Sequence, residues 1–279
     1  MRGLYVPYVQ WSLIFLLLHN LFYTLHIYDD EYGFKGSVSH LYTWEEMGIR
    51  AIHIAVGLHG TEQLLGGYWF LPQLLYASIM GFFIIKYIKK LYAGCALALL
   101  GAIIASAFDL HVPFWGIKSL SFLSTAFFLM GYLYKQKFNN WNQGYLTLLF
   151  AVTVAAGSIC CHVSMLTYTA EEIIPYFICA VCGTVMTLNI SRYIALHKNR
   201  FTQVLVYIGN NTLTVLTWHF LCFKFISLLV ILYYSLPMEQ LACFPVLPEY
   251  TNLWPVYTLA GVGIPLTGKY LWHKVRLAS

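Results

Sequence analysis

A histidine and a lysine lie within a hydrophobic stretch, IGNNTLTVLTWHFLCFK (208–224). His219 is suited to acid–base chemistry and hydrogen bonding near neutral pH, whereas the charge of Lys224 costs about 2.5–3.5 kcal/mol at the centre of a bilayer. The two residues are five apart, so on a helix they point about 140° away from each other. Together with Asn211 they predict a polar interior beside this segment. The alternative for His219 is a hydrogen bond between packed helices.

A second group of polar and aromatic residues lies within or close to the long stretch 26–67, which follows the first hydrophobic run. The predicted substrate-binding residues are His19, Asn20, Trp44, Glu62 and Trp69. Aromatic rings together with carboxylates are suited to binding a sugar. For His19 and Asn20 the alternative is hydrogen bonding at a helix end, and for the stretch itself it is a solvated loop.

The sequence contains no recognisable motif for several common kinds of metal, nucleotide or nucleophile site. No HExxH or similar metal spacing occurs, so no metal site is predicted, and there is no P-loop, GxSxG or Gly-rich dinucleotide motif. Cys179 and Cys182 form a CxxC without a second pair, and we interpret them as structural. With no motif for a bound cofactor, none is expected to be held permanently.

The composition identifies the environment that these residues require. Only 10% of the 279 residues are charged, while 59% are hydrophobic. A soluble domain carries about 25% charged residues because its surface faces water. The chain is therefore predicted to be an all-α, polytopic helix bundle in a membrane. Its net charge of +5 is attributed to anchoring at the cytoplasmic face, and no nucleic-acid partner is expected.

About eight segments are long and apolar enough to be transmembrane helices, each of which needs about 20 such residues. They are 4–25, 68–88, 91–108, 117–134, 144–161, 173–193, 212–236 and 254–271. With both termini in the cytoplasm, most basic residues fall at cytoplasmic ends, and all 11 acidic residues fall outside. This asymmetry of Lys and Arg is the one that sets orientation.

Two segments between the spans stand out. The outward-facing loop 26–67 is the longest, and long loops are usually functional; within it, WEEMGIRAIHIAVGL (44–58) predicts a short interfacial helix. The stretch 197–211 is basic and cytoplasmic, and it leads into the segment of His219. The whole chain, 1–279, is interpreted as one membrane domain.

Three phrases resemble those of a known family. IGNNTLTVLTWHFLCFK is similar to a late-helix signature, YWFLPQLL (68–75) to a W-F-L phrase, and MRGLYVPYVQWSLIF (1–15) to a basic loop with a proline that precedes a third span. Their order and the topology resemble those of the integral-membrane acyltransferase-3 family. The resemblance implies a bacterial inner-membrane enzyme that moves an acyl group, acetyl or succinyl, from acyl-CoA to a sugar hydroxyl of a surface or exported polysaccharide.

The resemblance begins after the family's second span. The first family span carries a basic residue and, about eleven positions later, the histidine regarded as catalytic, and the second span carries an F-x-x-S-G-like phrase. Neither pattern occurs before Arg2. We therefore expect the chain to be truncated or wrongly started. The residue that acts as the catalytic base in the family is then missing, so no residue of this chain is assigned that role, and little activity is expected in this form. His219, Lys224 and Asn211 are expected to line the site.

The resemblance also implies where the substrates bind. The residues expected to meet the phosphates of acyl-CoA, a co-substrate, are Arg2, Arg192, Lys198 and Arg200; Arg suits phosphate geometry. The expected acceptor is a glycan or a lipid-linked sugar at the outer loop.

Two other functions fit the same polar residues within apolar helices. A transporter or flippase of a polar or lipid-linked molecule explains His219 and Lys224 equally well, although no internal repeat of the kind common in transporters is present. A non-catalytic membrane scaffold is the third possibility.

Overall fold

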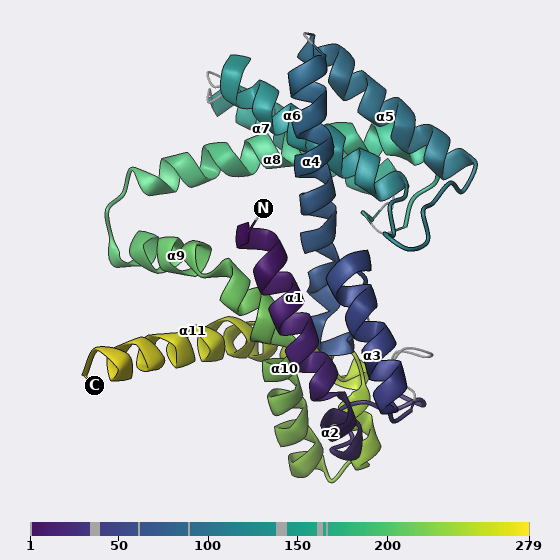
Figure 1. The fold of residues 1–279 in the computed structure, drawn as a ribbon. Helices are drawn as coiled ribbons and strands as arrows, with labels where there is room; N and C mark the ends of the chain where they lie inside the picture. The colour runs from purple at the N-terminus through teal and green to yellow at the C-terminus, as the bar shows by residue number, and fades with distance from the viewer. Residues whose placement is uncertain are drawn as a thin grey trace. The chain divides into compact units, whose positions relative to one another are not determined.

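The computed structural model describes residues 2–33, 40–60, 62–88, 90–137, 144–160, 164–165 and 167–278. Throughout these residues the regular structure is helical, which confirms the predicted all-α class. The chain divides into two compact units (Figure 1). One contains residues 1–70 and 203–279, and the other contains residues 71–202.

The first unit brings together the two ends of the chain. Its elements are α1 (Arg2–Leu17), α2 (His19–Thr24), α3 (Trp44–Ile52), the π-turn η1 (His53–Gly57), the 3₁₀ helices η2 (Gln63–Trp69), η4 (Met238–Ala242) and η5 (Pro248–Leu253), and the long helices α10 (Thr212–Tyr234) and α11 (Trp254–Ala278). α10 packs against α11 and against η2. The predicted first span, 4–25, is divided between α1 and α2 at Leu18.

Local sequence signals explain the helix predicted within 44–58, which is confirmed as α3 followed by η1. The Thr43 side chain accepts a hydrogen bond from the Glu46 backbone N–H at 3.2 Å, which caps the first turn. Glu45 and Glu46 lie in that first turn and Arg50 lies in the last, so the charges complement the helix dipole. The segment ends at Leu58, whose φ of 58° is left-handed.

The second unit contains α4 (Phe70–Tyr87), α5 (Leu91–Ala107), α6 (Ser119–Lys137), α7 (Gly144–Cys160), η3 (Ala170–Glu172) and α8 (Ile173–Ala195). Its core lies chiefly between α5 and α6, where Ala98 packs with Leu129 and Ala102 with Leu123. Small residues on one helix let membrane helices approach closely. The short helix α9 (Arg200–Asn210) begins in this unit and ends in the first.

The apolar segments of the sequence correspond to helices, but only some have the full length of a membrane span. Among the residues described, three helices are long and apolar enough to cross a membrane: Gln63–Tyr87, Ala170–Ala195 and Thr212–Tyr234. Gly3–Leu17, Leu91–Ala107 and Gly144–Ile159 are apolar but shorter. A helical membrane protein is therefore supported, whereas the number of eight spans and the cytoplasmic placement of both termini stay predictions.

Candidate functional site

Three of the predicted substrate-binding residues, His19, Asn20 and Glu62, form a network together with Tyr28 and Tyr42. We call these five residues the His19 cluster. His19 Nδ1 lies 3.2 Å from Glu62 Oε2, and His19 Nε2 lies 3.1 Å from the backbone oxygen of His40. Both side chains are almost fully buried. Because a carbonyl oxygen only accepts hydrogen bonds, Nε2 is the donor to the His40 oxygen.

The other members of the His19 cluster hold the loop against α2. The Tyr42 ring stacks on the His19 ring at 3.4 Å between centroids. Asn20 donates to the Tyr42 carbonyl at 2.9 Å and accepts from the Tyr42 N–H at 2.8 Å. Burial, and then the charge of Glu62, raise the pKa of Tyr28 well above its ordinary value. Within the described residues, Glu62 Oε1 and the Tyr28 hydroxyl are buried without a hydrogen bond of standard geometry.

Trp44 and Trp69 lie in different surroundings from this cluster. Trp44 begins α3 and is 83% exposed, whereas Trp69 ends η2, half-buried, with its ring edge-on to Phe70. The structure therefore brings His19, Asn20 and Glu62 together. Glu62 bonds to His19, while His19 and Asn20 bond to the backbone of His40 and Tyr42. A role in substrate binding for these five residues stays a prediction.

α10 places His219 and Lys224 on different faces, as the five-residue spacing predicts. His219 Nδ1 lies 3.1 and 3.0 Å from the carbonyls of Val215 and Leu216 in its own helix. Two carbonyl partners require Nδ1 to be the donor, so in the neutral ring Nε2 keeps a lone pair. His219 faces η2: a Cβ on Gly67 would lie 3.8 Å from its Cε1 and 2.7 Å from Leu216 Cδ1, so glycine allows this close approach.

Lys224 is fixed by the backbone of a later segment. It is 3% exposed, and its Nζ donates to the carbonyls of Leu241 at 2.8 Å and Cys243 at 2.7 Å. The polar interior predicted for this lysine is thus supplied by main-chain oxygens. Asn211 precedes α10, is half-buried and donates to the Tyr207 carbonyl at 2.8 Å.

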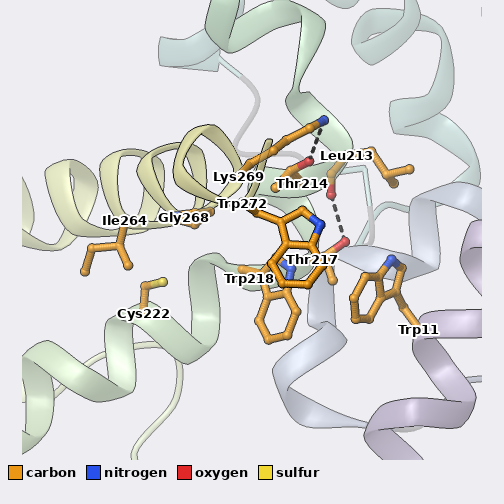
Figure 2. A pocket seen from close by; sticks show the side chains of 11 residues that line it. Trp11, Leu213, Thr214, Thr217, Trp218, Cys222, Ile264, Gly268, Lys269 and Trp272 are labelled. Carbon is orange, nitrogen blue, oxygen red and sulfur yellow. Dashed lines mark hydrogen bonds between the residues drawn. The ribbon is translucent and has the colours of Figure 1, made fainter. Parts of the chain in front are cut away.

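A cavity of about 580 Å³ lies between α1, α10 and α11 of the first unit (Figure 2). α10 contributes Leu213, Thr214, Thr217, Trp218 and Cys222, and α11 contributes Ile264, Pro265, Gly268, Lys269 and Trp272. Trp11 of α1 completes the lining, and its ring meets that of Trp218 edge-on at 5.1 Å. This volume is within the range of small-molecule sites, which are mostly apolar with a few polar groups.

The polar groups of the cavity are few. Lys269 Nζ lies 3.4 Å from Thr214 Oγ1, a long hydrogen bond (Figure 2). Thr217 donates to the Leu213 carbonyl at 2.8 Å, and its hydroxyl lies 2.6 Å from that of Tyr68. Sequence reasoning did not select Lys269 or the three indoles, because they come from helices far apart in the chain and no spacing connects them.

The basic residues predicted to meet acyl-CoA are divided between the units. Arg2 begins α1, and its side chain is outside the described residues; Arg192, Lys198 and Arg200 belong to the second unit and are exposed. The Arg192 guanidinium lies 5.9 Å from the centre of the Tyr134 ring. Arg192, Lys198 and Arg200 do not line the cavity, and the role of all four residues stays a prediction.

Comparison with known proteins gives one result. Residues 1–271 match the model of an acyltransferase domain, that of the acyltransferase-3 family. No curated protein matches the chain, and no solved structure does. The resemblance drawn from three short phrases is therefore confirmed over nearly the whole sequence.

Proposed function

The chain belongs to the acyltransferase-3 family, and on that premise we propose that it transfers an acyl group from acyl-CoA to a sugar hydroxyl of a surface or exported polysaccharide. The family match is the observation that carries the proposal, since it identifies a membrane acyltransferase in general terms. We place the protein in the bacterial inner membrane. In the reaction, the sugar oxygen bonds to the thioester carbonyl carbon, the C–S bond breaks, and the hydroxyl proton leaves with the thiol.

The cavity supports a site for the acyl-bearing arm of the donor. Thr214 is the third residue of α10, so this end of the cavity faces the cytoplasm in the predicted topology, where acyl-CoA is found. Lys269 and the threonine hydroxyls supply polar contacts there, and Trp11, Trp218 and Trp272 supply apolar walls. A ligand with a polar part and an apolar part fits this arrangement.

The exposed cations support a site for the phosphates of the donor. Arg192, Lys198 and Arg200 are exposed, and no Asp or Glu occurs between Glu172 and Glu239. Charge-assisted hydrogen bonds from Arg to phosphate are among the strong ones. We propose that these residues, with Arg2, bind CoA.

His219 supports hydroxyl binding near the centre of α10. With Nδ1 donating to the helix backbone, Nε2 of the neutral ring is available to accept a hydrogen bond from a substrate hydroxyl. We propose that His219 lines the site, and the identity of the catalytic base is not assigned.

Acyl transfer in membranes tests the function. The protein is expressed from its own locus, and its membranes are given acetyl-CoA with a labelled acyl group together with the host polysaccharide. Label on the polysaccharide that requires the protein supports the proposal. Movement of a polar or lipid-linked molecule across the membrane, without acyl transfer, contradicts it and favours a transporter.

A further inference from the structure

The two ends of the cavity differ in polarity. Among the described residues, Lys269 is the one charged residue of the lining, and its amine lies beside Thr214 at the start of α10 (Figure 2). Cys222 follows Thr214 by eight residues, which is about 12 Å along the helix. The cavity thus has a polar end at Lys269 and an apolar end at Cys222.

Among the residues that the structure describes, no charged side chain lies at the apolar end to pair with a carboxylate. This end is formed by Trp218, Cys222 and Ile264. Ile264 is 45% exposed, so in a bilayer this end borders lipid, which is equally apolar. Lys224, the cation of α10, has its ammonium bonded to two backbone carbonyls and does not line the cavity.

This difference restricts the acyl group. If the polar part of the donor arm lies at Lys269, its acyl group extends toward Cys222. A second carboxylate on that group, as in succinyl, would then enter an apolar region without a partner, which is strongly unfavourable. A hydrocarbon chain gains from burial in the same place.

We propose that the apolar end of this cavity selects a neutral aliphatic acyl group and excludes dicarboxylic ones, with Cys222 and Ile264 as the specificity-determining residues. The inference rests on the proposed function, because it narrows the donor used in that reaction. It predicts that acetyl-CoA and butyryl-CoA are donors and that succinyl-CoA is not.

Donor competition tests the selection. Membranes carrying the full protein are given acetyl-, butyryl- or succinyl-CoA, and kcat/KM for transfer is measured for each. We expect the value for succinyl-CoA to be at least tenfold below that for butyryl-CoA. Equal use of succinyl-CoA, or a preference for it, overturns the inference while leaving the proposed function intact.

Narrowing the apolar end tests the position of the acyl group. Two variants narrow this end: Cys222→Phe on α10, and Ile264→Phe on α11, where the side chain is more exposed. Each is expected to lower kcat/KM for butyryl-CoA at least tenfold more than kcat/KM for acetyl-CoA, because the longer chain needs the space that the phenyl ring fills. Leu229→Phe is the matched control, since Leu229 lies on α10 outside the cavity and is 48% exposed. Equal losses for both donors in variants that insert and melt normally contradict the assignment.

A binding measurement separates this inference from the reaction itself. A photoreactive butyryl-CoA analogue is expected to label the peptide 213–222, and excess butyryl-CoA, but not succinyl-CoA, is expected to prevent the labelling. Labelling elsewhere, labelling that neither donor prevents, or labelling that both prevent equally overturns the proposal even where no acyl transfer is detected. Absence of transfer from all three donors, with this labelling intact, contradicts only the proposed function.

Discussion

The His19 cluster and the cavity lie in the same unit, but they differ in how fully their polar side chains are hydrogen-bonded. In the cluster, both ring nitrogens of His19 have hydrogen-bond partners, and Asn20 bonds to both the N–H and the carbonyl of Tyr42. In the cavity, Lys269 makes a single long hydrogen bond at the edge of an apolar space. The side chains of the cluster bind each other and the backbone, and so stabilise the fold. Lys269 lines a cavity and makes only a weak contact with Thr214, so its amine is suited to binding a ligand.

The largest expected effect removes the carboxylate of the cluster. Glu62→Ala leaves His19 Nδ1 buried without its acceptor, which costs about 1–3 kcal/mol, and the cavity left by the lost side chain adds to that loss. Thermal unfolding of the purified protein measures the loss, with Glu45→Ala, an exposed carboxylate nearby, as the control. A variant of normal stability that has lost activity would show that the cluster is a ligand site and not a structural contact.

The next effect compares two lysines of the same unit. Lys224→Met removes both donors to the Leu241 and Cys243 carbonyls, and unsatisfied buried groups cost about 1–3 kcal/mol. Lys269→Met, at the edge of the cavity, is expected to change stability by less than about 0.5 kcal/mol and to raise the KM for acyl-CoA. Denaturation and steady-state kinetics on both variants measure this difference; equal loss of stability would contradict it.

A smaller effect is expected at His219. His219→Ala removes the proposed acceptor for a substrate hydroxyl, and we expect kcat/KM to fall about tenfold, equivalent to about 1.4 kcal/mol, with normal insertion into the membrane. His219→Gln, which keeps a hydrogen-bonding side chain, is expected to recover part of the activity. Unchanged turnover in His219→Ala would return this residue to a role in helix packing.

The smallest effect concerns the surface of α3 near the cluster. Hydrogen bonding from Arg50 at 2.8 Å, with help from His40 at 3.0 Å, lowers the pKa of Glu46, although partial burial opposes the shift. A carboxyl whose pKa is lower in the folded protein stabilises it above the unfolded pKa, and this contribution is lost as pH falls below about 4.5. Because the pair is near the surface, the change is under about 1 kcal/mol.

Hydrogen exchange of the α3 amides at pH 6 and pH 3.5 measures this dependence. Glu46→Gln is expected to remove it, since the amide does not titrate. The same pH dependence in the variant would assign the effect to another group.

How much of this was predictable differs between the fold and the site. Long apolar runs predicted α4 to α8, α10 and α11 closely, because burial of hydrophobic residues in lipid depends on composition and length. Pro72, Pro175 and Pro255 lie in first turns, where a missing N–H matters little. Thr43 and Glu46 likewise mark the start of α3 in the sequence.

The site depended on contacts that no local pattern contains. The partners of Lys224 are backbone oxygens, which every sequence has, so the residue alone did not reveal them. In the sequence, Lys269 is one of several basic residues at predicted cytoplasmic helix ends, and nothing there indicates that it lies beside Thr214. The chemistry of the chain was recognised from short phrases, but which side chains share a cavity required the three-dimensional arrangement.

The two hydrogen bonds from Lys224 to the Leu241 and Cys243 carbonyls also have a consequence for insertion of the protein into the membrane. These two carbonyl partners lie 17 and 19 residues later in the chain, so they leave the ribosome after α10 does. Until then the ammonium within α10 has no internal acceptor, and an unpartnered charge in lipid is costly. We therefore expect the insertion machinery to retain α10 until the segment through Cys243, which precedes α11, has been made.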